Sequence, residues 1–130
     1  MFQLFLGLAG CLGAISVAAG AFASHALKDQ LSDRALEIFE TGARYQMYHA
    51  LGLLLIAMLL SQSNSLGLNG TWLNTAGIAF TVGIVLFSGS LYALSLSGIK
   101  ILGAITPLGG VGFIVGWGCL AIAAFTLNNG

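Results

Sequence analysis

The sequence has very little charge. Only 6% of its 130 residues are Asp, Glu, Lys or Arg, against about 25% in a typical soluble domain. Because 58% of the residues are apolar, a soluble fold of this size could not cover its outside with polar side chains. The apolar residues form continuous blocks and do not alternate with polar ones, which excludes a membrane β-barrel. The composition therefore predicts helices that span a lipid bilayer.

Several chemical signals are also missing. The net charge is zero, so the chain has no basic surface for nucleic acid and no polybasic segment for anionic lipid. Its two cysteines, Cys11 and Cys119, lie inside apolar blocks and are interpreted as small packing residues. No HExxH, CxxC or GxSxG pattern occurs, so the sequence predicts no catalytic residue and no metal site. A function without enzymatic activity is favoured.

Long apolar segments define the predicted membrane spans. We expect four of them, over about 4–23, 44–60, 71–96 and 108–127. At 1.5 Å per residue the first covers about 30 Å, the thickness of one hydrocarbon core, whereas the second needs part of the preceding segment to cross. Thr106 is expected to cap the last helix, with Pro107 at its first position. Residues 1–130 are predicted to form a single integral membrane domain.

The charge is concentrated in one segment. Seven of the eight charged residues lie between Lys28 and Arg44, where apolar residues recur every three to four positions. This pattern predicts an amphipathic helix over about 33–43, capped by Ser32, that lies along the membrane interface and then bends or continues into the second span. Gly42 is the expected bend. The predicted fold is an all-α membrane protein, a bundle of four transmembrane helices with an amphipathic interfacial helix between spans one and two.

The basic residues predict the orientation in the membrane. All four lie in the segments 28–44 and 97–105, which four spans place on the same side of the bilayer. Lys and Arg are enriched in cytoplasmic loops. We therefore expect these two segments to be cytoplasmic and both termini to lie outside.

Small residues predict how the helices pack. Gly10, Ala14 and Ala18 share one face of the first span, and Gly112 and Gly116 form a GxxxG pattern in the fourth. Small residues allow membrane helices to approach closely. They predict a tight bundle, with a further small face available for a partner.

Four segments carry a resemblance that covers nearly the whole chain. In order, they are "GAFASHALK" (20–28), "FETGARYQMYHALGLL" (39–54), "LFSGSLYALS" (86–95) and "TPLGGVGFIVGW" (106–117). The sequence resembles the small membrane proteins of domain-of-unknown-function family 423, which include a mitochondrial relative. Ala23 stands where the family pattern has glycine, a small-for-small exchange. The resemblance implies a multi-pass protein of the bacterial cell (inner) membrane and no activity, because the family has none established.

Ionisable side chains at membrane depth are costly and are therefore candidates for function. The sequence allows a single polar cluster at the cytoplasmic ends of spans one to three, made of His25, Glu40, Arg44, Tyr45, Gln46, His49 and Tyr92. Glu40 and Arg44 are four residues apart, which favours an ion pair. Alternatively, these side chains lie at the interface, where an apolar body and a polar tip both find partners, and only fix helix register.

Three functions stay open. The first is an accessory or scaffold subunit, or a homo-oligomer, that acts by helix packing, with membrane lipid and another membrane protein or a second copy as partners. The second is a ligand, proton or lipid-headgroup site built on the polar cluster. The third is a haem b or quinone carrier, with His25 and His49 as axial ligands. No cofactor is required by the sequence, and haem b is the one considered.

Overall fold

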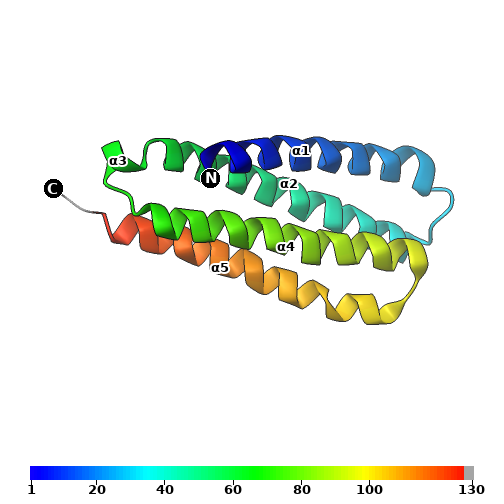
Figure 1. Ribbon diagram of the computed structural model, residues 1–130. Helices are drawn as coiled ribbons and strands as arrows, with labels where there is room; N and C mark the ends of the chain where they lie inside the picture. The colour runs from blue at the N-terminus through cyan, green and yellow to red at the C-terminus, as the bar shows by residue number, and fades with distance from the viewer. Residues whose placement is uncertain (128–130) are drawn as a thin grey trace.

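The computed structural model describes residues 1–127, which form helices and connecting loops without a strand (Figure 1). The long helices are α1 (Phe2–Phe22), α2 (Asp33–Ser61), α4 (Gly70–Ser97) and α5 (Thr106–Phe125). A π-helical turn (Ala23–Leu27) extends α1, the short helix α3 (Ser63–Leu66) follows α2, and a 3₁₀ turn (Lys100–Ala104) precedes α5. All four long helices are long and apolar enough to cross a membrane, which confirms the predicted all-α fold.

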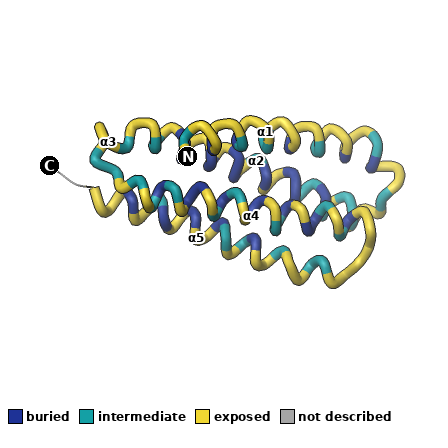
Figure 2. Tube along the Cα trace, in the orientation of Figure 1, coloured by how far each residue is buried: buried dark blue, intermediate teal, exposed yellow. Residues whose placement is uncertain are grey.

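The bundle is centred on α2 and α4. Helix α1 packs chiefly on α2, α2 on α4, and α4 on α5. As a result α1 and α5 lie on opposite sides of the central pair (Figure 1). Buried positions concentrate on the two central helices, while most of α1 and α5 faces outward (Figure 2). The two outer helices therefore offer the largest surfaces to lipid or to a partner.

The predicted interfacial helix over 33–43 is helical but is not a separate element. It runs without a break into the second span and forms the first part of α2. Ser32 caps the helix as predicted, because its hydroxyl accepts a hydrogen bond from the N–H of Ala35 at 3.1 Å. Gly42 does not interrupt the helix. It is buried under the ring of Tyr92, which a Cβ at this position would meet at 3.0 Å, so the glycine makes room for α4.

The start of α5 also differs from the prediction. Helix α5 begins at Thr106, with Ile105 as the capping position and Pro107 at the second helical residue. The hydroxyl of Thr106 lies 2.6 Å from the hydroxyl of Ser90 on α4 and does not cap the helix. The Thr106 hydroxyl therefore makes a tertiary contact with α4 in place of the local cap that the sequence predicts. The helix ends at Phe125, two residues before the predicted limit of 127.

Helices α4 and α5 interlock because glycines on each face phenylalanines on the other. A Cβ on Gly116 would come within 2.5 Å of the Phe80 ring, and one on Gly83 within 2.6 Å of the Phe113 ring. Gly112 lies between them, where its Cβ would be 3.2 Å from the Cα of Gly83. Both glycines of the GxxxG pattern thus lie in the α4–α5 interface, where they allow aromatic rings to lie against a helix backbone.

Two further glycines bring backbone and side chain together. A Cβ on Gly109 of α5 would lie 2.3 Å from the main-chain nitrogen of Phe87 on α4. On the other side of the bundle, a Cβ on Gly77 would lie 2.4 Å from the ring of Phe5 on α1. Phe5 is 1% exposed, so this contact fixes the start of α1 against α4. Neither position has room for a larger residue.

The small residues of α1 take no part in this packing. Gly10, Ala14 and Ala18 are all exposed, and a Cβ on Gly10 would meet nothing within 4 Å. Helix α1 contacts the bundle through a different face, on which Phe5, Ala9 and Ser16 are buried. The predicted stripe therefore lies on the outer surface of the bundle.

The loops and helix ends gather at two ends of the bundle. The N-terminus, the 62–69 linker and the end of α5 lie toward one end (Figure 1). The 28–32 loop and the 98–105 connection lie at the other, which we call the charged end because Lys28, Arg34 and Lys100 are there. Gly98 ends α4 at this end with a φ of 70°, a conformation that glycine adopts without strain.

Candidate functional site

The residues predicted as one polar cluster do not converge on one cavity. Gln46 contacts Tyr92 in the core, and His49 lies in an aromatic pocket beside the turn that carries Tyr45. Glu40 and Arg44 line a groove on the surface, and His25 is exposed on the π-helical turn after α1. Each group has its own environment and is described separately.

Gln46 joins three helices in the bundle core. Its Nε2 donates a hydrogen bond to the carbonyl of Leu12 on α1 at 2.8 Å, and its Oε1 accepts one from the hydroxyl of Tyr92 on α4 at 2.7 Å. The side chain is 3% exposed. A buried amide in an apolar surrounding is costly unless both of its ends are paired, and here both are. These bonds fix the rotation of α1, α2 and α4 relative to one another.

Two serines add bonds of the same kind. The Ser16 hydroxyl on α1 donates to the carbonyl of Ala43 at 2.6 Å, and the Ser88 hydroxyl on α4 donates to the carbonyl of Gly42 at 2.7 Å. Neither serine belonged to the predicted cluster. Ser16 is the single polar side chain in the first apolar block, and that isolation is the signal that marks a buried hydrogen bond.

His49 is buried in a pocket of aromatic rings. Its Nδ1 lies 2.8 Å from the carbonyl of Tyr45, and its Nε2 lies 3.1 Å from Nε1 of Trp117. A carbonyl only accepts and an indole N–H only donates, so the arrangement requires the neutral ring with its proton on Nδ1. The ring stacks on Phe113, with centroids 3.5 Å apart and planes at 7°, and meets Phe80 edge-on. Both ring nitrogens are therefore occupied.

The two histidines predicted as haem ligands are far apart. Helices α1 and α2 are antiparallel, with Ser16 opposite Ala43. His25 is nine residues past Ser16 and lies level with about residue 34, so it is about 22 Å along the helix axis from His49. One iron cannot bind both side chains. Within residues 1–127, no group of three or more His, Cys, Asp or Glu side chains could hold a metal ion.

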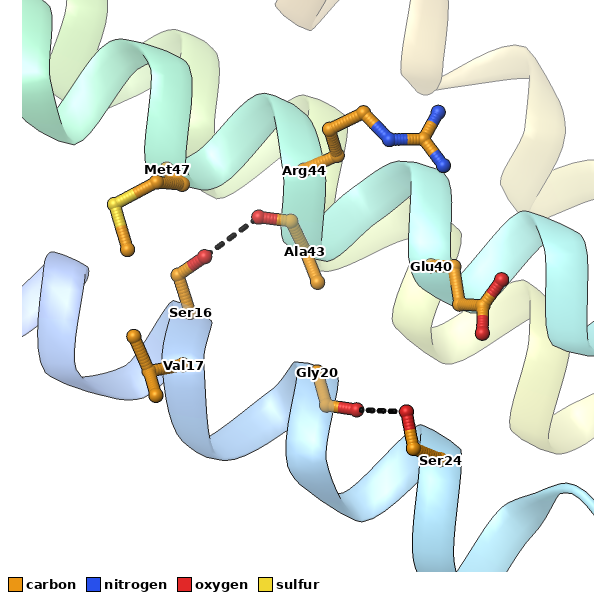
Figure 3. Close-up of a pocket in the computed structure, with 8 residues that line it drawn as sticks. All are labelled: Ser16, Val17, Gly20, Ser24, Glu40, Ala43, Arg44 and Met47. Carbon is orange, nitrogen blue, oxygen red and sulfur yellow. Dashed lines mark hydrogen bonds between the residues drawn. The ribbon is translucent and has the colours of Figure 1, made fainter.

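Glu40 and Arg44 line an open groove of about 320 Å³ between α1 and α2 (Figure 3). The predicted ion pair between them is wrong, because the one ion pair in the described part of the chain joins Arg34 to Glu37 at 3.2 Å. Figure 3 shows the Arg44 side chain extended along α2 toward the turn that carries Glu40. The other residues of the groove are Ser16, Val17, Gly20, Ser24, Ala43 and Met47.

A double-mutant cycle tests the bond between Gln46 and Tyr92. We expect Gln46→Leu and Tyr92→Phe each to lower the free energy of unfolding, with a coupling energy of about 1 kcal/mol because each change removes the same bond. The measurement is equilibrium unfolding of both single variants and the double variant in mixed micelles. Tyr45→Phe is the matched control, since no protein group bonds its hydroxyl within residues 1–127. Strictly additive losses would contradict the bond.

Known proteins share this sequence over almost its whole length. The family model described as protein of unknown function (DUF423) matches residues 19–110. The chain is 47% identical over 121 residues to a UPF0382 membrane protein of Staphylococcus epidermidis (strain ATCC 12228), which covers 93% of this chain and 94% of the relative. It is 45% identical over 122 residues to the UPF0382 membrane protein YwdK of Bacillus subtilis (strain 168), covering 94% and 96%. No solved structure gives a significant match.

These matches confirm the resemblance expected from the sequence. Because the family model covers most of the chain and the bacterial relatives are named membrane proteins, the chain is an integral membrane protein that belongs to the DUF423 family.

Proposed function

We propose that this protein acts by helix packing within the membrane, as an accessory or scaffold subunit of a membrane complex or as a homo-oligomer. The observation that carries the proposal is the outer face of α1. This face is exposed along its whole length and consists of small residues at three- to four-residue spacing, namely Gly7, Gly10, Cys11, Ala14, Ala18 and Ala21. Such a face lets the backbone of a second helix approach closely.

The other outer helix has a different surface. Most exposed residues of α5 are bulky, and Ile114 is 73% and Phe125 89% exposed; Gly118, Ala121 and Ala124 are the small exceptions. Bulky apolar side chains fill the space against acyl chains, whereas a row of glycine and alanine makes few contacts with lipid and many with a second helix. This contrast favours α5 as a lipid-facing helix and α1 as the helix that binds a partner.

The proposed location is the bacterial cell membrane, with the charged end in the cytoplasm and both termini outside. The support is the distribution of basic residues. All four lie in the segments 28–44 and 97–105, which adjoin the charged end. None lies in the 62–69 linker or in the first 27 residues. Cytoplasmic loops carry an excess of Lys and Arg, so this asymmetry supports the proposed orientation. Cysteine labelling of each end in intact cells measures it.

The native thiol of Cys11 allows a direct test. Cys11 lies in the outer face of α1, whereas Cys119 is buried. We expect a short thiol cross-linker, applied to native membranes, to convert the 13.4 kDa chain into a dimer if the partner is a second copy, or into a defined heavier adduct if it is another thiol-bearing protein. Cys11→Ser should abolish the product, since Cys119 is not accessible.

Adding larger side chains to the outer face of α1 is the second part of this cross-linking test. Ala14→Leu and Ala18→Leu should reduce the cross-linked fraction several-fold without lowering the melting temperature, because both residues are exposed. Ala121→Leu is the matched control, since Ala121 is exposed on α5. Only monomer at Cys11 in membranes, together with a monomeric protein free of co-purifying chains in mild detergent, would contradict the proposal.

A further inference from the structure

A groove follows the seam between α1 and α2 and has two parts. The part nearer the charged end is the polar groove that holds Glu40 and Arg44. Next to it lies an apolar trough of about 140 Å³, lined by small and aliphatic residues that include Ala9, Gly13 and Leu54. Met47 lines both parts, so they adjoin. The seam therefore has a charged part, which we call the charged head, next to the apolar trough.

The charged head offers two side chains that the protein leaves without a partner. Within residues 1–127, neither Glu40 nor Arg44 takes part in the ion pair, and no side-chain hydrogen bond involves either. They are one turn apart on α2, which separates their Cα atoms by about 6 Å along the helix axis. Charges beside apolar helices are costly without a partner of opposite sign, so a ligand that supplies one would bind favourably.

The two charges are ordered along the membrane normal. Glu40 is nearer the charged end, and Arg44 lies one turn deeper on α2, next to Met47, which lines the apolar trough as well. A phospholipid headgroup with an amine has the complementary order, because its phosphate lies next to the acyl chains and its ammonium group lies nearer to water. Arg binds phosphate through charge-assisted hydrogen bonds, and a carboxylate accepts such bonds from an ammonium group.

The apolar trough has room for a short stretch of an acyl chain. A Cβ built on Gly10 or Gly13 would meet nothing within 4 Å, so the backbone of α1 is open along this side. The bundle does not use this space for its own packing. An acyl chain in the trough would contact the α1 backbone and the exposed side chains of Leu51 and Leu54.

We propose that the α1–α2 seam binds one phospholipid of the leaflet at the charged end, with a headgroup that carries both a phosphate and a primary amine. Arg44 binds the phosphate, Glu40 accepts hydrogen bonds from the ammonium group, and an acyl chain fills the trough. The site discriminates against a quaternary amine, which has no N–H to donate, and against a glycerol headgroup, which places no cation beside Glu40. The trough adjoins the outer face of α1, because Gly10 belongs to both.

The test is native mass spectrometry of the purified protein, titrated with phosphatidylethanolamine, phosphatidylcholine and phosphatidylglycerol of identical acyl chains. We expect phosphatidylethanolamine to bind about tenfold more tightly than either of the others, a difference of about 1.4 kcal/mol. Glu40→Gln should remove most of this preference, and Arg44→Gln should weaken all three lipids. Gly13→Leu, which fills the trough, should weaken all three as well.

The matched control is Lys100→Gln, which removes a charge at the same end of the bundle but outside the seam. It should leave the three affinities unchanged. Because Glu40 and Arg44 bond no other side chain, their variants should keep the helical content and melting temperature of the native protein. Equal affinity for the three lipids, or a preference that survives both Glu40→Gln and Arg44→Gln, would overturn the proposal.

Discussion

Replacing Gly109 with alanine is expected to destabilise the protein by about 3 kcal/mol. The added methyl group would lie 2.3 Å from the main-chain nitrogen of Phe87 and 2.7 Å from its Cα. A backbone cannot rotate out of the way as a side chain does, so α4 and α5 must separate along their whole contact. The free energy of unfolding in mixed micelles, or the melting temperature in detergent, measures the loss.

The neighbouring residue is the control for this experiment. Gly110 is also helical, but its Cβ would meet nothing within 4 Å. Gly110→Ala should leave the stability unchanged or raise it by up to about 1 kcal/mol, because alanine favours the helix over glycine. If both variants have the same stability, α4 and α5 are not in contact at Gly109.

Replacing His49 with alanine is expected to cost about 3 kcal/mol of folding free energy. The change removes a ring that stacks on Phe113, deletes two hydrogen bonds and leaves the indole N–H of Trp117 without its acceptor. Equilibrium unfolding measures the cost. In a Trp72→Phe background, the emission of Trp117 should also shift, because Trp117 is then the one remaining indole.

His25 provides the comparison. It is exposed on the π-helical turn and bonds no group within the part of the chain that the structure describes. His25→Ala should therefore leave both the stability and the Trp117 emission unchanged. Equal effects of the two substitutions would mean that the two histidines have equivalent roles, as the single predicted cluster required. A stable His49→Ala protein with an unaltered spectrum would contradict the pocket itself.

The positions of the helices could be predicted because they depend on properties of neighbouring residues. An apolar block of the length that crosses a bilayer identifies each span, and Ser32 before an acidic residue marks the start of α2. The confirmed fold rests on these local signals. The expected bend at Gly42 and the cap at Thr106 were wrong because tertiary contacts at Gly42 and at Ser90 decide those points.

The rotation of each helix about its axis could not be predicted. A helix that is apolar on every side has no periodic pattern to show which face is buried. For this reason Gly10, Ala14 and Ala18 could be assigned equally to an inner or an outer face of α1. The pairing of Trp117 with His49 spans 68 residues and depends on the rotation of two such helices, so no local signal indicates it.

The order of packing has a consequence for how the protein is made. Each long helix packs chiefly on the one that precedes or follows it in the chain, and the connections between them are short. As the polypeptide leaves the ribosome, α1 and α2 can therefore pair before α4 and α5 are synthesised, whereas the contacts of α2 with α4 and the bond from Trp117 to His49 form afterwards. Mostly local contacts of this kind favour rapid assembly with few wrong pairings.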